Sequence, residues 1–384
     1  MSKGDIVELF PDGKNKKLPD GAADAGPDEA SMEIVPDTPD SGVSYELLDE
    51  LYYSLDLRSD LCGDTETVEG LRQQLDYMRD AMTALNDSYT RLCRKVEDTG
   101  GIVRCQSEGI HVYVNTRWNV RHGFSSRMGG LSRGWCGANF SYSRDPQHPH
   151  WVDFNYHRFA RAIGLDGLTA AAFTNQVHGN VVRIVTDADR HLPSDPPGPE
   201  CDGIVSATPG LTLFCFTADC APVLLYDPAA RVAGSIHCGW RSTVQDILRN
   251  AVGAMVSLGA EPGRISASVG PAIGPCCFET GTDVPEAVEK LLGVKAAREY
   301  ISKGARPGKF MVDLPGVVAE RLVQLGVPRD RIDICRDCTK CNGEDYLWSE
   351  RYSREHNTWR GSSAAAIQVP PAGADRDTGG SSLI

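Results

Sequence analysis

The most regular pattern of apolar and polar positions lies between residues 64 and 99. Apolar residues recur there at alternating steps of three and four, at Val68, Leu71, Leu75, Met78, Met82, Leu85, Tyr89, Leu92 and Val96. An unbroken heptad repeat of this length predicts a coiled-coil-like helix, which ends at Gly100 and Gly101. The seam over residues 68–96 either joins two copies into a homodimer or packs against the rest of its own chain.

The segments outside this helix have weaker patterns. Residues 1–43 are rich in Asp, Glu, Pro, Gly and Ser and hold too few apolar positions to offset the entropy of ordering, so they predict a disordered acidic tail. Residues 44–60 carry one apolar stripe at helical spacing, which predicts a short amphipathic helix. The Pro-, Gly- and Ser-rich residues 370–384 predict a second disordered tail.

Residues 105–369 show strand and helix patterns without a regular strand–helix–strand repeat. Apolar or alternating runs predict strands at 110–114, 171–176, 181–185, 211–216, 222–227, 231–236, 265–269 and 364–369. Apolar faces of helical period predict helices at 154–163, 240–258, 284–292 and 314–325. Because two of the strands are joined by a short turn, this order predicts an α+β domain with a mixed sheet.

That short turn is the segment from Asp227 to Ala230, which contains Pro228. Residues pair symmetrically about a turn, so a hairpin centred near Ala229 places position 220 opposite roughly position 238. Cys220 and His237 then meet at one end of the sheet.

An upstream histidine adds a third side chain that can bind a metal. His178 lies between the strands predicted at 171–176 and 181–185. A single histidine of this kind is most often a hydrogen-bonded core residue, but two imidazoles and a thiolate form a three-ligand set. For zinc, such a set leaves the fourth tetrahedral position open, as in catalytic sites. We expect Asp202 or Asp219 to orient an imidazole or to handle a proton.

Composition restricts the partners. A net charge of −13 over 384 residues argues against nucleic acid or an anionic membrane as a ligand. No apolar run reaches the roughly 18 residues of a membrane span, and the N-terminus lacks the apolar core of a signal peptide, so we expect a cytoplasmic protein. The 13 cysteines are spread along a long chain, which indicates free thiols and metal ligation rather than a disulfide framework.

An acidic chain that binds an anion needs a local cationic site. Arg127 precedes Gly129 and Gly130, and this segment predicts a turn whose guanidinium and backbone N–H groups hold a phosphate or a carboxylate. Arg241, near the start of the helix predicted after His237, is a second candidate for phosphate binding.

A second cluster of cysteines lies near the C-terminus. Cys335, Cys338 and Cys341 have the spacing of metal ligands, but a closed zinc site needs a fourth ligand and none is adjacent in the sequence. Whether this segment binds a second metal is left open by the sequence.

Several short segments occur in the order typical of one protein family. They are His122–Phe124, Ser126–Ser132, Asn139–Phe140, Gln176–Gly179, Cys201–Ile204, Pro209–Leu211, Thr217–Val223, His237–Arg241, Val269–Glu279, Val312–Leu314, Cys338–Thr339 and Trp348–Ser349, followed by Arg351 and Arg360. Through these segments, residues 105–369 resemble the laccase-domain family, also called multicopper polyphenol oxidase or zinc-dependent purine nucleoside phosphorylase.

The resemblance implies a fold, a site and an activity. The fold is the layered α/β sandwich of laccase-domain proteins, and the zinc ligands are His178, Cys220 and His237. Together with Asp219 they form the implied catalytic set, and the implied substrate contacts are Arg127, Gly129, Gly130, Asn139, Gln176 and Arg241. The implied reaction is phosphorolysis of adenosine, inosine, guanosine and methylthioadenosine to free base and ribose 1-phosphate, accompanied by deamination of adenosine.

Three other functions are compatible with the residues. Copper binds a nitrogen–sulfur site more tightly than zinc, so a copper-dependent polyphenol oxidase is one alternative. That alternative is weakened because, among nine histidines, only His148 and His150 have the His-x-His spacing of multicopper sites. A Cys220–His237 pair could instead serve a nucleophilic hydrolase, since imidazole lowers the pKa of a thiol. A coiled-coil scaffold with an inactive enzyme domain is disfavoured by three intact ligands.

Overall fold

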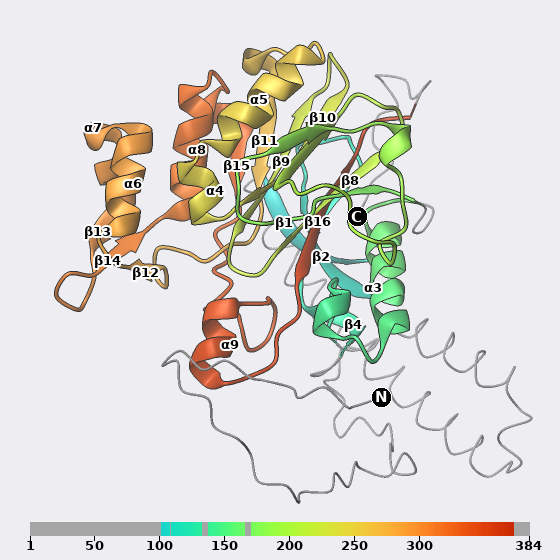
Figure 1. Cartoon of the computed structure of the whole chain (residues 1–384), viewed down its shortest axis with the longest axis horizontal. Helices are drawn as coiled ribbons and strands as arrows, with labels where there is room; N and C mark the ends of the chain where they lie inside the picture. Colours follow the sequence, from blue (N-terminus) through green and yellow to red (C-terminus); the bar gives the residue numbers. More distant parts are fainter. Residues whose placement is uncertain (1–100, 108, 133–136, 166–169, 372–384) are drawn as a thin grey trace, which may run out of the picture. The chain divides into compact units, whose positions relative to one another are not determined.

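A computed structural model describes residues 101–107, 109–132, 137–165 and 170–371 (Figure 1). Several predictions concern segments outside these residues: the two disordered tails, the short amphipathic helix, the heptad helix and its homodimer. Only the first two positions of the C-terminal tail, 370 and 371, are described. All of these structures remain predictions. Within the described residues, no helix is both long and apolar enough to cross a bilayer.

Two six-stranded sheets form the centre of the domain. The first has the order β1 (Ile102–Ser107), β2 (Ile110–Asn115), β3 (His122–Ser125), β16 (Ser363–Gln368), β8 (Thr212–Thr217) and β5 (Ala172–Phe173). The second has the order β15 (Ile332–Ile334), β11 (Ser266–Val269), β9 (Ala221–Asp227), β10 (Val232–Cys238), β7 (Gly203–Ser206) and β6 (Val182–Ile184). Most neighbours are antiparallel, whereas β5–β8, β6–β7 and β11–β15 are parallel, which confirms the predicted mixed character.

The remaining elements are short strands and helices. The strand β4 is Met128–Ser132, and a small third sheet contains β12 (Glu279–Thr280), β14 (Phe310–Val312) and β13 (Ile301–Lys303). The α-helices are α3 (Pro149–Ala162), α4 (Trp240–Val244), α5 (Ile247–Ser257), α6 (Asp283–Leu292), α7 (Val294–Ala297), α8 (Leu314–Gln324) and α9 (Glu350–His356). Single 3-10 turns lie at Tyr142–Arg144, Asp187–Asp189, Pro262–Arg264, Arg298–Tyr300 and Arg329–Arg331.

Alternation along β8 explains how the two sheets are layered. Leu213 packs in the buried cluster between the two sheets, together with Phe124 of the first sheet and Leu224 of the second. Its neighbour Phe214 points the other way and packs with Phe159 of α3. A strand buried on both faces is apolar throughout, as the sequence of this segment predicted.

The second sheet is covered on its outer face by α5 and α8, whose side chains share a buried cluster with β9 and β10. Figure 1 shows these helices on the opposite side of the sheets from α3. The order helix, sheet, sheet, helix is the layered α/β sandwich that the resemblance implied, and it is confirmed.

The helix predicted at 240–258 is wrong in one respect, because α4 and α5 are separate. Asp246 lies between them with a left-handed backbone (φ 65°), which interrupts the helical hydrogen bonds. Its carboxylate accepts hydrogen bonds from Arg321 at 2.6 and 2.8 Å and from Arg249 at 2.7 Å. A contact to α8 therefore fixes a break that the continuous apolar stripe of the sequence conceals.

The β9–β10 hairpin brings two candidate ligands together as predicted, with a register one residue different. Cys238 pairs with Ala221, so position 220 lies opposite Gly239 rather than 238. Asp227 closes the turn, because its buried carboxylate accepts the N–H groups of Ala229 and Ala230 at 2.9 and 3.1 Å. Cys220 and His237 consequently lie at the same end of the second sheet.

Candidate metal centre and adjoining cavity

His178, Cys220 and His237 come together at one end of the second sheet. His178 lies in the loop between β5 and β6, Cys220 immediately precedes β9, and His237 is in β10. One ligand atom from each lies within 4.8 Å of the others, and Cys220 Sγ is 3.7 Å from His178 Nε2. The arrangement brings together the three residues predicted as ligands.

Asp202 holds two of these side chains in place. Its Oδ1 accepts a hydrogen bond from His237 Nδ1 at 2.7 Å, which directs Nε2 of that ring toward the other ligands. The same carboxylate accepts the backbone N–H groups of Val177, His178 and Gly179 at 2.8 to 3.1 Å. These bonds hold His178 in a left-handed backbone conformation (φ 61°). Carboxylates that orient metal-binding histidines in this way are a regular feature of metal sites.

Electrostatics at the centre favour a thiolate. Burial raises the pKa of the Cys220 thiol, but the charge of His237 and the hydrogen bond with His178 outweigh burial and lower that pKa to about 6. Burial lowers the pKa of His237, but the Cys220 thiolate and Asp202 raise it to about 9. A thiolate beside two imidazoles is a donor set that fits zinc or copper.

Gly239 allows the backbone to approach this centre. A Cβ atom there would lie 3.1 Å from Cys220 Sγ and 3.0 Å from His178 Cδ2. Arg241, two residues further along, is exposed on α4 with its guanidinium carbon 4.6 Å from the centre of the Trp240 ring. Its predicted contact with phosphate remains a prediction.

Asp219 connects the centre to the C-terminal part of the chain. Its Oδ1 accepts a hydrogen bond from Thr339 Oγ1 at 2.6 Å, and its Oδ2 accepts the backbone N–H of Arg351 at 2.7 Å. The residue adopts φ 90°, a costly value for a side chain other than glycine. Asp219 thus fixes the start of β9 and with it Cys220, while its predicted catalytic role remains a prediction.

The turn predicted after Arg127 is wrong, because the segment forms the strand β4, while anion binding there remains a prediction. Arg127 Nη1 donates to the carbonyls of Gly343 and Glu344, each at 2.7 Å, and the guanidinium lies 4.5 Å from the centre of the Trp348 ring. Packing accounts for the two glycines: a Cβ at Gly129 would lie 2.2 Å from the carbonyl oxygen of Gly109.

Replacing Gly130 by alanine is expected to destabilise the fold. The new Cβ would lie 2.3 Å from Ala138 Cα, and backbone cannot move aside cheaply. We expect a loss of about 1–3 kcal/mol in the free energy of unfolding, measured by denaturant titration. Gly253→Ala is the matched control: it lies in α5 with no atom within 4 Å of its Cβ, and should be neutral or stabilising. If Gly130→Ala instead keeps its stability and binds phosphate more weakly, Gly130 serves anion binding rather than packing.

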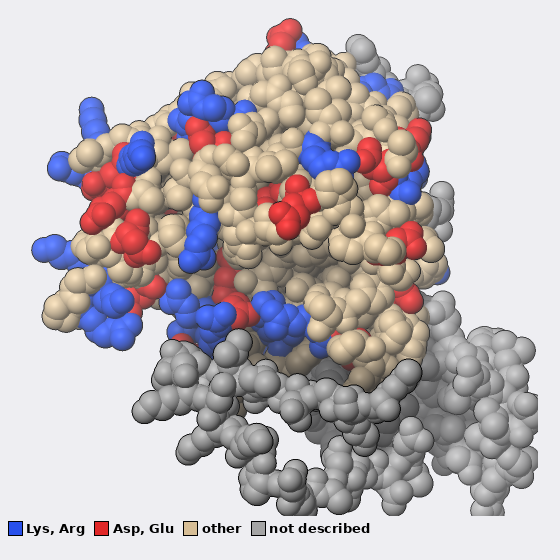
Figure 2. Space-filling model, in the orientation of Figure 1, with Lys and Arg blue, Asp and Glu red and all other residues tan. Residues whose placement is uncertain are grey.

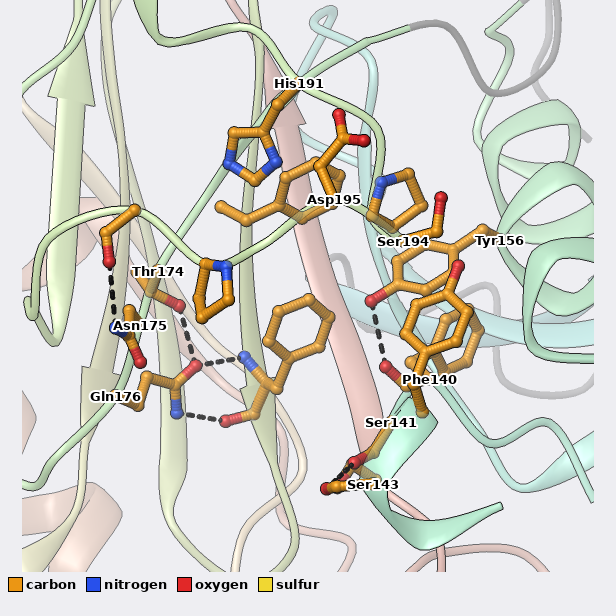
Figure 3. A pocket seen from close by; sticks show the side chains of 17 residues that line it. Phe140, Ser141, Ser143, Tyr156, Thr174, Asn175, Gln176, His191, Ser194 and Asp195 are labelled. Atoms are coloured by element: carbon orange, nitrogen blue, oxygen red, sulfur yellow. Dashed lines mark hydrogen bonds between the residues drawn. The ribbon is translucent and has the colours of Figure 1, made fainter. Parts of the chain in front are cut away.

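The amides of Asn139 and Gln176 bind the backbone. Asn139 Oδ1 accepts the N–H groups of Ser141 and Ser362, each at 3.0 Å. Gln176 bonds to both the N–H and the carbonyl of Phe216 at 2.7 Å (Figure 3). Both side chains bond to the backbone in this structure, and their direct contact with a substrate remains a prediction.

A cavity of about 450 Å³ adjoins these residues (Figure 3). Its walls are rich in aromatic rings and small polar groups, among them Phe140, Tyr142, Tyr156, Phe173, Phe216, Asn175, Gln176, Ser141, Ser143 and Ser362. Gln176, which lines the cavity, is two residues before His178 in the sequence, whereas His178, Cys220 and His237 are not among the lining residues. No local sequence pattern indicates this cavity, because its walls come from segments far apart in the chain.

A cluster of arginines borders the same region. Arg144, Arg354 and Arg360 all pair with the Glu350 carboxylate, so three positive charges face one negative charge. Burial and the charge of Arg144 hold the pKa of Arg360 below its usual value. Figure 2 shows positive side chains gathered over α9. Arg144 follows Ser143 in the sequence and Arg360 precedes Ser362 by two residues, and both of these serines line the cavity.

The comparisons with known proteins agree with this architecture. The family described as multi-copper polyphenol oxidoreductase laccase matches residues 121–370. A purine nucleoside phosphorylase from Deinococcus radiodurans is 43% identical over 210 residues, which cover 54% of this chain and 76% of that protein. The protein named adenosine deaminase RL5, from an unknown prokaryotic organism, is 30% identical over 195 residues, covering 50% of this chain and 73% of that protein.

Solved structures give the same result. The crystal structure of YlmD from Geobacillus stearothermophilus matches with a TM-score of 0.60 and 26% identity, covering 71% of this chain and 97% of that one. The hypothetical protein YfiH of Bacillus licheniformis matches with a TM-score of 0.61 and 28% identity, covering 67% and 96%. The chain therefore belongs to the multi-copper polyphenol oxidoreductase laccase family, the laccase-domain proteins.

Proposed function

We propose that this chain is a zinc-dependent purine nucleoside phosphorylase that also deaminates adenosine. The observation that carries the proposal is the convergence of His178, Cys220 and His237 in a two-histidine, one-thiolate centre. Relatives named purine nucleoside phosphorylase and adenosine deaminase support both activities. The substrates are adenosine, inosine, guanosine and methylthioadenosine, with phosphate.

The residues divide the chemistry between them. Aromatic walls such as Phe140 and Tyr156 offer stacking surfaces for a purine. The arginine cluster around Glu350 holds phosphate, whose oxygen attacks the anomeric carbon of ribose while the carbon–nitrogen bond to the purine breaks. The base leaves with the bonding electrons and takes up a proton, which gives free purine and ribose 1-phosphate.

His178, Cys220 and His237 would hold the zinc ion, and Asp202 keeps the His237 ring in its orientation. Zinc bound there supplies Lewis acidity, which deamination by water requires at neutral pH. Arg241 and Arg127, which the resemblance implied as substrate contacts, are secondary candidates for binding the anion.

A cysteine hydrolase is the second candidate. The lowered pKa of Cys220 beside His237 is what a nucleophilic thiolate needs. A copper-dependent polyphenol oxidase has less support, because His148 and His150 belong to neither of the two groups of potential ligands found among the described residues. The metal in the purified protein and the fate of the nucleoside separate these functions.

The test is chromatography of inosine and adenosine incubated with the zinc-loaded protein, with and without phosphate. We expect hypoxanthine and ribose 1-phosphate from inosine only when phosphate is present, and inosine from adenosine without it. If neither inosine nor adenosine is consumed, the proposal is overturned. If the purified protein contains copper and consumes oxygen when phenols are added, the function is that of the copper-dependent polyphenol oxidase instead.

A further inference from the structure

A second group of potential metal ligands lies outside the centre described above. Cys276 and Cys277 are in the loop between β11 and β12, and Cys338 and Cys341 follow β15. The four sulfur atoms all lie within 4.8 Å of one another, and none of the four residues belongs to the His178 centre. Two loops about sixty residues apart in the sequence therefore present four thiols to one point.

The distances suit a shared metal ion. Cys341 Sγ is 3.5 Å from Cys276 Sγ and 3.4 Å from Cys277 Sγ. A disulfide would bring two sulfurs to about 2.05 Å. Four sulfurs at about 2.3 Å from a tetrahedral zinc lie about 3.8 Å from one another, close to the observed spacing.

Backbone N–H groups point at the sulfur of Cys338. Cys338 Sγ accepts the backbone N–H of Gly274 at 3.2 Å and those of Lys340 and Cys341 as well. The Cys338-x-x-Cys341 spacing is typical of structural zinc sites. Lys340 adds a positive charge that interacts with Cys277 as well as with Glu355.

We propose that Cys276, Cys277, Cys338 and Cys341 bind a structural zinc ion with four thiolate ligands. The site is closed, because four protein ligands complete the tetrahedral coordination of zinc. Cys335 is buried outside the group, so the second site suggested by the cysteine spacing has different members from those expected. The missing ligands come from the Cys276–Cys277 pair, which local spacing alone does not reveal.

The zinc fastens two loops that support the catalytic centre. Ala272 forms an isolated bridge with Cys338, and Thr339 donates to the Asp219 carboxylate. Ile273 donates its N–H to the carbonyl of Asp219 at 2.8 Å. The four-cysteine site therefore joins the two loops whose residues bond to Asp219, and it contributes no ligand to the His178 centre.

The experiment counts zinc in the full-length protein after purification, by elemental mass spectrometry. The unmodified protein should carry two zinc ions per chain, and Cys341→Ser should carry one. Cys220→Ala should also carry one, and the double variant none. Cys335→Ser is the matched control, because it removes a cysteine from the same segment but outside the group, and it should keep two. Cys276→Ser, at an exposed position, repeats the test if Cys341→Ser fails to fold.

Cobalt substitution tests the ligand set without any enzyme assay. In the Cys220→Ala background, cobalt should give the strong visible absorption of tetrahedral thiolate coordination, and adding Cys341→Ser should abolish it. Zinc content that Cys341→Ser leaves unchanged, or iron in place of zinc at the four cysteines, would overturn the proposal, whereas a single zinc that Cys341→Ser removes would leave it standing and count against zinc at the His178 centre. A disulfide among the four cysteines, seen as missing alkylation in the denatured, unreduced chain, would overturn it as well. None of these outcomes depends on whether the chain cleaves nucleosides.

Discussion

Replacing Cys220 by alanine is expected to remove the catalytic zinc and to abolish nucleoside turnover. Cys220 supplies the only thiolate among the three predicted ligands, and its removal leaves two imidazoles that are too few to hold the ion tightly. Losing several kcal/mol of stabilisation of the transition state corresponds to a decrease of about a thousandfold or more in kcat/KM. The measurements are zinc content and the rates of inosine phosphorolysis and adenosine deamination.

The zinc content of Cys220→Ala separates loss of the metal from loss of a nucleophile, and a second cysteine variant serves as the control. Cys105→Ser in β1 removes a thiol of the first sheet that belongs to neither metal group, and it should leave zinc content and both rates unchanged. If Cys220→Ala keeps its full zinc content and both activities, His178 and His237 do not form the proposed site with it. If it keeps zinc at the centre but loses activity, Cys220 acts as a nucleophile, as in the hydrolase alternative.

Local patterns in the sequence predicted the elements that local forces determine. The β9–β10 hairpin follows from a turn between two apolar strands, and the turn is closed by the nearby carboxylate of Asp227. The same information could not locate the break between α4 and α5, because the partner of Asp246 is Arg321, 75 residues away. The apolar stripe continues through the break and gives no sign of it.

The surroundings of the centre were harder to predict for the same reason. Gly129 and Gly130 have the composition of an anion-binding turn, yet their lack of a Cβ serves packing against the backbone of Gly109 and Ala138. No local motif indicates that Arg144 belongs to the arginine cluster, because it joins the cluster through Glu350, more than two hundred positions later in the sequence. The three candidate ligands were found because each lies in a family motif and a strand hairpin aligns two of them.

Asp202→Asn is expected to weaken zinc binding by about 10–100-fold without removing any ligand. The carboxylate accepts His237 Nδ1–H and three backbone N–H groups, two on each oxygen, so an asparagine must turn its NH2 donor toward two of them. The unsatisfied contacts should also cost about 1–3 kcal/mol in the free energy of unfolding. Chelator competition measures the affinity, and thermal unfolding of the metal-free protein measures the stability.

The pH dependence of that stability gives an independent check. Burial raises the pKa of Asp202, but the hydrogen bonds from His237, Gly179 and Val177 outweigh burial and hold it below its usual value. A carboxyl whose pKa is lowered by folding stabilises the protein above its ordinary pKa of about 4, and this contribution disappears as the pH falls through the lowered value. The difference in stability between the unmodified protein and Asp202→Asn should therefore be full at neutral pH and narrow below about pH 4.

Asp189→Asn is the matched control for this experiment. Asp189 also has a lowered pKa and pairs with Arg183 at 2.6 Å, but it belongs to neither metal group. Its substitution should change stability slightly and leave zinc affinity unaltered, because a partly exposed ion pair at the surface contributes little. If Asp202→Asn binds zinc as tightly as the unmodified protein, the hydrogen bond to His237 does not position the ligand, and Asp202 serves only to fold the loop around His178.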